Sequence, residues 1–165
     1  MKRLTFLTTS LLALLAKIPA RGGEKNEKCP VMTAEDIDAE QTVEYDGIPV
    51  RFCCRSCIKV WNRNPRYVIK ASAALLPQFE GMADKLELDK VVLLEQRFCP
   101  VNTTNLVTPD SPSVDFKGVK VYLWDEDCVK KWNEDPEGCA RRAGEAGLLP
   151  QLPKKASPSK DLSVA

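Results

Sequence analysis

The sequence predicts an α+β fold that is built twice, and a long internal repeat with two hairpin signals carries that prediction. A passage that begins at Cys29-Pro30-Val31 returns at Cys99-Pro100-Val101. The matched positions that follow lie 71 residues apart: Val43, Gly47, Val50, Cys57, Trp61, Asn62 and Pro65 recur as Val114, Gly118, Val121, Cys128, Trp132, Asn133 and Pro136. A repeat of this kind marks each copy as one structural unit. We expect each unit to be a β-hairpin followed by two short helices.

The repeat also sets the expected domain boundaries. The first unit should occupy residues 29–77 and a second, degenerate unit residues 90–149. The polar segment 150–165, rich in Pro, Ser and Lys, is predicted to be a disordered tail. A unit of about 50 residues buries little apolar surface, so it usually needs disulfides, a metal ion or a partner unit for stability.

The hairpins are predicted from turn residues between apolar runs. Asp46-Gly47 separates Val43–Tyr45 from Ile48–Phe52, and Lys117-Gly118 stands at the matching place in the second copy. Asp-Gly between two such runs is a strong cue for a tight hairpin turn. The glycine is the residue that both copies share, as a turn with positive φ requires.

The helices are predicted from Asn/Asp-Pro pairs, a typical N-cap followed by proline at the first helical position. Asn64-Pro65 should open a helix to about Leu76, and Asp135-Pro136 a helix to about Ala146. Other expectations are an acidic loop or short helix over 33–41 and a strand over 91–94. The two repeated tryptophans are interpreted as core residues that hold the first helix of each unit against its hairpin.

The first 20 residues are interpreted as a signal peptide. Lys2 and Arg3 precede an apolar run over 4–16, and Ala20 offers a small residue for cleavage. The run is shorter than the about 20 apolar residues of a membrane-spanning helix. We therefore expect an exported protein, periplasmic or extracellular, with no membrane association beyond the export signal.

Charge does not point to a polyanionic partner. The formal charge is +1, and loss of Lys2, Arg3 and Lys17 with the signal peptide removes three positive charges and leaves −2. Acidic and basic residues are interspersed along the chain. We therefore expect no nucleic-acid partner.

The chemistry of the chain is expected in its cysteines. There are seven, and there is no histidine, so histidine-based hydrolases are excluded. No set of catalytic acid, base and nucleophile is visible, and we predict that the protein is not an enzyme. The first unit contains four cysteines (Cys29, Cys53, Cys54 and Cys57) and the second contains three (Cys99, Cys128 and Cys139).

The spacing in the first unit predicts a metal site. Cys53 should lie at the end of the hairpin, Cys57 in the first turn of the helix, and Cys29 in a distant loop that closes over both. A helix N-terminus favours thiolates. Tetrahedral thiolate sites suit zinc, and soft thiolates also suit Cu(I). We expect the sulfurs of Cys29, Cys53 and Cys57 to converge to within roughly 4 Å of each other.

The first unit closely resembles the TRASH and YHS-type metal-binding domains. The passages that carry the resemblance are CPV at 29–31, FCC at 52–54, the cysteine at 57 and WNRNP at 61–65. The resemblance covers about 29–76 well and 99–146 more loosely, and Cys-Pro-Val replaces the Tyr-His-Ser signature. It implies small treble-clef-like domains that handle or sense heavy metals. In that pattern Cys29, Cys53 and Cys57 match the metal ligands, and Cys54, the extra cysteine of FCC, ranks fourth. A larger metalloprotein or another exported protein is the partner that such a role implies.

Two alternatives to a metal remain open. Export favours disulfides, and Cys29–Cys53 or Cys29–Cys57 are plausible pairs in a metal-free interaction module. The segment Cys54-Arg55-Ser56-Cys57 is also a C-x-x-C between a strand and a helix, as in thiol–disulfide redox proteins.

The second unit has lost most of the cluster. Trp124 and Asp125 stand where Cys53 and Cys54 are in the first copy, and only two of the cysteines persist. Asp125 and Asp127 are interpreted as helix caps rather than ligands. We expect a degenerate copy kept for packing, with a Cys99–Cys128 disulfide as one possibility. Cys139, which has no counterpart, is expected to be a buried small apolar residue.

Overall fold

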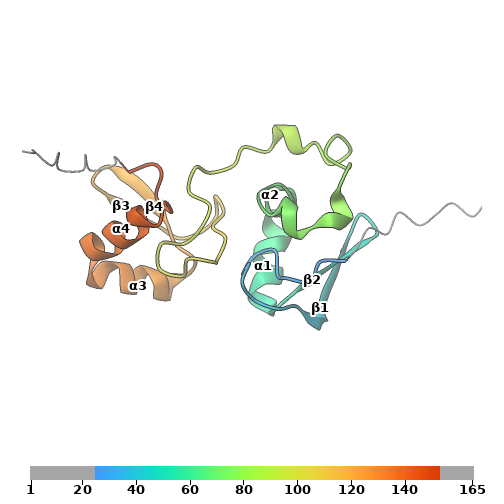
Figure 1. Cartoon of the computed structure of the whole chain (residues 1–165), viewed down its shortest axis with the longest axis horizontal. Helices are drawn as coiled ribbons and strands as arrows, with labels where there is room; N and C mark the ends of the chain where they lie inside the picture. The colour runs from blue at the N-terminus through green and yellow to red at the C-terminus, as the bar shows by residue number, and fades with distance from the viewer. Residues whose placement is uncertain (1–24, 153–165) are drawn as a thin grey trace, which may run out of the picture.

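The structure, a computed structural model, describes residues 25–152 and has the predicted α+β fold (Figure 1). Two separate two-stranded antiparallel sheets are each followed by a pair of helices. The first unit contains β1 (Asp38–Tyr45), β2 (Ile48–Phe52), α1 (Arg55–Arg63) and α2 (Pro65–Ala71). The second unit contains β3 (Ser113–Phe116), β4 (Val119–Tyr122), α3 (Glu126–Glu134) and α4 (Pro136–Glu145).

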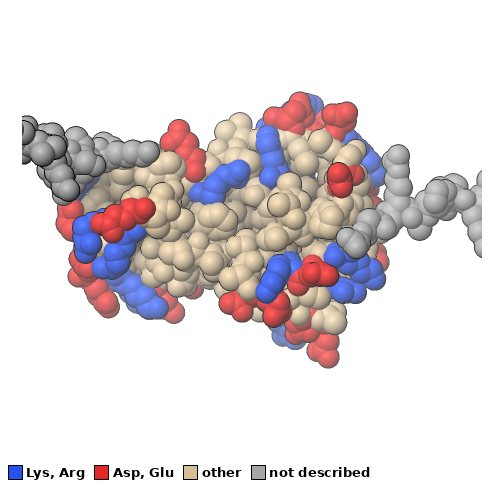
Figure 2. Space-filling view, viewed as in Figure 1, with Lys and Arg blue, Asp and Glu red and all other residues tan. Residues whose placement is uncertain are grey.

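A long connector links the two units and contains three short 3-10 helices, η1 (Ala73–Leu75), η2 (Pro77–Phe79) and η3 (Leu88–Lys90). The predicted signal peptide and most of the predicted tail (153–165) lie outside the described residues. Within residues 25–152, no helix has both the length and the apolar character needed to cross a membrane. Acidic and basic side chains are interspersed on the face drawn in Figure 2.

Both hairpins turn through two residues with positive φ, as the sequence predicted. The angle is 55° at Asp46 and 75° at Gly47, and it is 56° at Lys117 and 79° at Gly118. Two successive positive φ values are typical of the type I′ turn, whose twist matches that of the flanking strands. The second turn residue is glycine in both copies because glycine adopts this conformation without steric cost.

The repeated tryptophans occupy equivalent places in two separate cores. Trp61 and Trp132 are each only 1% exposed. Trp61 meets the ring of Tyr45 edge-on at 5.6 Å between centroids, and Trp132 meets Phe116 in the same way at 5.5 Å. Each contact joins the first helix of a unit to the first strand of its hairpin. The interpretation of both tryptophans as core residues is therefore confirmed.

The helix that follows differs between the units at its start. Both α2 and α4 begin with proline. The Asp135 carboxylate accepts a 2.9 Å hydrogen bond from the Gly138 N–H, so the predicted cap is confirmed there. Asn64 occupies the predicted N-cap position before Pro65, but its side chain makes no capping hydrogen bond and donates to the Asp110 carboxylate at 2.6 Å instead. That bond links the first unit to the segment before β3.

Three predicted boundaries are wrong. The segment 33–41 forms a turn and then the start of β1, because Asp38 pairs with Phe52 across a register irregularity. The helix α2 ends at Ala71 instead of about Leu76, and the chain continues as 3-10 turns. The segment 91–94 is not a strand. It lacks a neighbouring strand in the described part of the chain, and the Val92 side chain is 85% exposed.

The two units are joined through the loops that follow their Cys-Pro-Val sequences. The Leu106 N–H donates to the Val31 carbonyl at 2.8 Å, and the Thr33 N–H donates to the Thr104 carbonyl at 2.9 Å. The Leu106 side chain belongs to the second copy in sequence, yet it is buried in the core of the first unit. The second copy therefore supports the loop that contains Cys29.

The core position of Trp132 leads to a stability prediction. Trp132→Ala should lower the free energy of unfolding by about 3–5 kcal/mol, because it removes the largest buried side chain of the second unit. Asn133, the exposed neighbour on the same helix, provides the control. Asn133→Ala should change the free energy of unfolding by less than about 0.5 kcal/mol. Urea unfolding of the two variants measures the difference, and equal midpoints would contradict the assignment of Trp132 to the core.

Candidate metal centre

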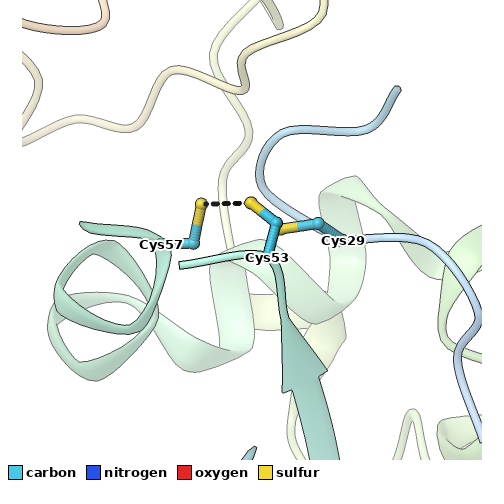
Figure 3. A group of neighbouring side chains, drawn as sticks. All are labelled: Cys29, Cys53 and Cys57. Carbon is cyan, nitrogen blue, oxygen red and sulfur yellow. Dashed lines mark hydrogen bonds between the residues drawn. The ribbon is translucent and has the colours of Figure 1, made fainter. Parts of the chain in front are cut away.

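Three structural elements bring the cysteines of the first unit together. Cys53 follows the last residue of β2, Cys54 occupies the N-cap position of α1, and Cys57 lies in the first turn of that helix. Cys29 comes from the loop that precedes β1, more than twenty residues earlier in the chain. Figure 3 shows the side chains of Cys29, Cys53 and Cys57 directed toward one another from these elements.

The sulfur atoms of Cys29, Cys53 and Cys57 all lie within 4.8 Å of one another. This is slightly wider than the expected separation of roughly 4 Å. Cys53 and Cys57 are 3.5 Å apart, close to the about 3.8 Å that separates two sulfurs in a tetrahedral zinc site with 2.3 Å bonds. Among residues 25–152, this is the one group of three or more cysteine or carboxylate side chains with such close ligand atoms.

Cys54 lies beside this group, as its fourth rank anticipated. Its sulfur is 3.8 Å from that of Cys53 and 3.6 Å from that of Cys57. The closeness of Cys54 and Cys57 also fits the redox alternative. The surrounding fold does not, because thioredoxin-type C-x-x-C motifs lie in a βαβ unit. Here the strand before Cys54 belongs to an antiparallel hairpin.

Cys29 is held in a tight turn. Its N–H donates to the Glu35 carbonyl at 3.0 Å, and the Glu35 N–H donates to the Met32 carbonyl at 2.9 Å. The Met32 N–H in turn donates to the Cys29 sulfur at 3.4 Å. An N–H aimed at a sulfur stabilises the thiolate form, so the turn prepares Cys29 to act as a ligand.

The thiols influence one another's ionisation. A hydrogen bond from the Cys57 thiol, with backbone N–H groups, lowers the pKa of Cys29 to about 5 despite its burial. Burial and the charge on Cys29 raise the pKa of Cys53 to about 12. The hydrogen bond to Cys29, burial and the same charge raise the pKa of Cys57 far above its usual range. Without a cation, one thiolate therefore suppresses the others, and a bound cation would remove that repulsion.

The start of helix α1 lowers the pKa values of the nearby thiols less consistently than expected. Burial raises the pKa of Cys54, but the backbone N–H of Cys57 and the neighbouring thiols outweigh it, so the pKa is lowered overall. The pKa of Cys57 is raised although it lies in the first turn. The expectation that the helix N-terminus lowers thiol pKa values thus holds for Cys54 and is wrong for Cys57, where the negative neighbour dominates.

The second unit retains the scaffold of the site without its ligands. Cys99 and Cys128 are both buried and free, so the suggested disulfide between them is absent. The backbone N–H groups of Val101 and Asn102 donate to the Cys99 sulfur at 3.4 Å. Trp124, which replaces Cys53, packs between the two cores. Among residues 25–152, this unit has no group of three or more cysteine or carboxylate ligand atoms as close together as those of the first unit.

The two aspartates interpreted as helix caps in the second unit have different roles. The Asp125 carboxylate accepts a 2.8 Å hydrogen bond from the Cys128 N–H and caps α3. The cap predicted at Asp127 is wrong, because Asp127 lies inside α3 and forms an exposed ion pair with Lys130 on the same helix. Asp125 therefore occupies the position of the repeat that Cys54 occupies in the first unit, and it provides a carboxylate cap there instead of a thiol.

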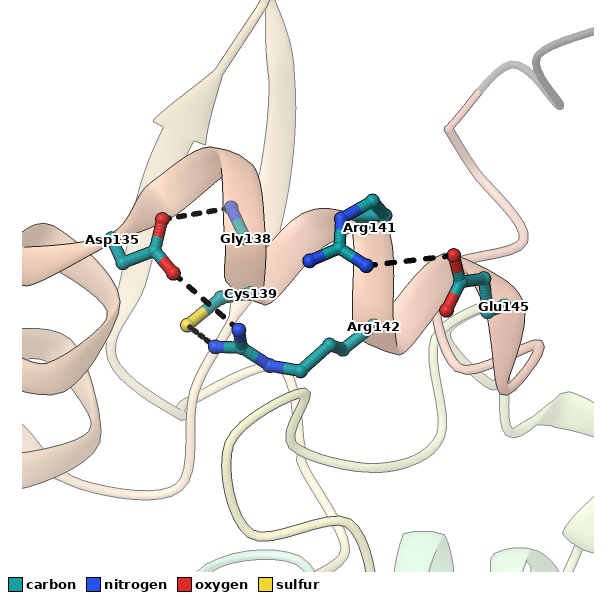
Figure 4. Close-up of polar contacts among 6 residues, drawn as sticks. All are labelled: Asp135, Gly138, Cys139, Arg141, Arg142 and Glu145. Carbon is teal, nitrogen blue, oxygen red and sulfur yellow. Dashed lines mark hydrogen bonds and ion pairs between the residues drawn. The ribbon is translucent and has the colours of Figure 1, made fainter.

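Cys139 is buried in the second core, as expected for a small apolar residue. Figure 4 shows it on α4, where the Arg142 guanidinium donates to its sulfur at 3.3 Å and also contacts the Asp135 carboxylate. Arg141 and Glu145 pair one turn apart on the same helix. These contacts hold the surface of α4 together and do not extend to another cysteine.

Sequence reasoning missed one sulfur near the cluster. The Met32 thioether lies 3.7 Å from the Cys53 sulfur. The repeat contains a signal that could have identified it, because the first copy has Met32 after Cys-Pro-Val and the second copy has Asn102.

Comparisons of the chain with protein-family models, with curated proteins and with solved structures found no match.

The two aspartates of α3 provide a test of the capping assignment. Asp125→Ala should lower the free energy of unfolding by about 1 kcal/mol, because it leaves the Cys128 N–H without its side-chain acceptor. Asp127→Ala is the matched control and should cost less than about 0.5 kcal/mol, as an exposed ion pair contributes little. Chemical unfolding compares the variants, and a larger loss for Asp127→Ala would reverse the assignment.

Proposed function

We propose that this protein is exported and binds one transition-metal ion, zinc or copper, through the thiolates of Cys29, Cys53 and Cys57. The observation that carries the proposal is the approach of the three sulfurs to within 4.8 Å of one another. They come from a loop, a strand end and a helix, so the fold itself brings them together. Cys54 is close enough to two of them to serve as a further ligand.

A metal ion explains the cluster better than a disulfide does. A disulfide joins two sulfurs and leaves the third in the same buried environment. One cation contacts all three and compensates their negative charge, which the neighbouring thiols otherwise oppose. Metal binding would also supply stability that a unit of this size cannot draw from its core alone.

We propose further that the protein is not an enzyme and acts as a metal carrier, a sensor or an accessory module for a larger exported metalloprotein. The chain has no histidine, and the cysteines are the only concentration of reactive groups that the sequence offers. The apolar leader at residues 4–16 supports a periplasmic or extracellular location.

Native mass spectrometry of the full chain, reduced and then supplied with zinc or Cu(I), tests the metal site. We expect one retained ion per chain and loss of retention in Cys53→Ser and Cys57→Ser. The control is Cys139→Ser, which removes a buried cysteine outside the group and should keep the ion. A folded, metal-free chain whose Cys29, Cys53 and Cys57 are alkylated without effect would refute the proposal, and a metal-free chain with those cysteines oxidised would favour the disulfide alternative.

Removal of the metal should also destabilise the protein. A ligand that binds only the folded state adds about 2.7 kcal/mol at a free concentration of 100 times its dissociation constant. Thermal unfolding with and without a chelator should therefore show a lower midpoint for the chelated wild type. Cys57→Ser should show no further decrease on chelation, and an equal decrease in that variant would place the stabilising metal elsewhere.

A further inference from the structure

The backbone around Met32 is fixed from both sides. Its N–H donates to the Cys29 sulfur at 3.4 Å, and its carbonyl accepts from the Glu35 N–H at 2.9 Å. The residues on either side of Met32 are bonded to the second unit, through the Val31 carbonyl and the Thr33 N–H. A side chain that starts from such a constrained position has a defined direction, which is the requirement for a preorganised ligand.

The Met32 side chain points to the cysteine cluster. Its sulfur lies 3.7 Å from the sulfur of Cys53, within the range of the separations between the thiols themselves. In that contact the thiol of Cys53 donates to the thioether. The thioether therefore accepts a hydrogen bond from Cys53, and a lone pair of the Met32 sulfur faces the cysteine that is a proposed ligand.

The second unit provides an internal comparison at this position. Asn102 occupies the matching place in the turn, and its N–H donates to the Cys99 sulfur at 3.4 Å. The Asn102 amide side chain also points to the remaining cysteines and donates to the Cys128 sulfur at 3.3 Å. The scaffold therefore directs this side chain toward the cysteines in both copies. The copy with the complete cysteine group has a sulfur there, and the copy without it has an amide.

We propose that Met32 is a metal ligand and that the site in the first unit is an all-sulfur site selective for a soft monovalent ion such as Cu(I). The inference rests on the proposed function, since it assigns a further ligand to the same site. Thioethers and thiolates are soft donors that suit Cu(I), whereas zinc in proteins is bound by cysteine, histidine and carboxylate side chains. A neutral thioether also adds a fourth donor without adding another negative charge to the cluster.

Packing is the competing explanation, because methionine often fills irregular gaps and Met32 is half-buried beside the first core. Substitution by leucine distinguishes a packing residue from a metal ligand. Met32→Leu keeps the size and apolar character of the side chain, at a cost below about 1.5 kcal/mol, and removes only the sulfur. Met32→Asn introduces the residue of the second copy.

The first experiment is a competition titration of the full chain with Cu(I) and a Cu(I) chelator under anaerobic, reducing conditions. We expect Met32→Leu and Met32→Asn to weaken Cu(I) binding by at least about tenfold, the lower end of the effect seen for residues that support a metal site. The control is Met82→Leu, which changes another half-buried methionine of the first core and should leave the affinity unchanged. Zinc affinity should not change in Met32→Leu.

The second experiment detects a methionine ligand directly, and Met32→Leu assigns the signal to one methionine. The full chain, produced with selenomethionine and loaded with Cu(I), is measured by X-ray absorption at the selenium edge. The chain has three methionines. A copper neighbour of selenium that disappears in Met32→Leu identifies Met32 as the ligand.

The outcomes separate the two proposals. Wild-type protein that binds Cu(I) without a copper neighbour at selenium, with an unchanged affinity in Met32→Leu, would overturn the role of Met32 and leave the cysteine site intact. An equal loss of zinc and Cu(I) affinity in that variant would also overturn it, because it would show an effect of packing. Wild-type protein that retains neither metal would refute the proposed function itself.

Discussion

Repulsion between thiolates is the constraint on which the first unit depends. Three cysteine sulfurs within 4.8 Å of each other, partly shielded from water, cannot all carry a negative charge unless a cation lies among them. The opposite pKa shifts of Cys29 and Cys57 express this competition directly. A loop, a strand end and a helix bring these sulfurs together, and the resulting group is compatible with a bound metal ion.

The two copies of the repeat share one scaffold, but only the first copy has the complete cysteine group. Hairpin turns, buried tryptophans and the turn after Cys-Pro-Val are maintained in both copies. The copies differ at the sulfur cluster, where Cys53, Cys54 and Met32 are replaced by Trp124, Asp125 and Asn102. Each replacement serves the structure of the second unit, as packing, as a helix cap and as a hydrogen bond to the remaining cysteine. The second unit also supports the turn of Cys29 through backbone hydrogen bonds, so it contributes to the candidate site.

Local chemistry made several features predictable. The turn glycines, the Asp135 cap and the places of Cys53 and Cys57 relative to strand and helix depend on residues within a few positions of one another. The errors have a different origin. Asn64 fits the sequence pattern of a capping residue, but its side-chain amide donates a hydrogen bond to Asp110 of the other unit. The segment 91–94 has the composition of a strand but no strand beside it to supply hydrogen bonds.

The sequence by itself determined the fold class, the two copies and the cysteines of the candidate site, because these follow from local patterns and from the comparison of one copy with the other. Tertiary structure decided how the copies meet. Leu106 enters the core of the first unit, and the turn that contains Met32 is bonded to the second. No local pattern encodes a contact between residues so far apart in the chain. The position of the Met32 sulfur 3.7 Å from Cys53 was therefore visible only in three dimensions.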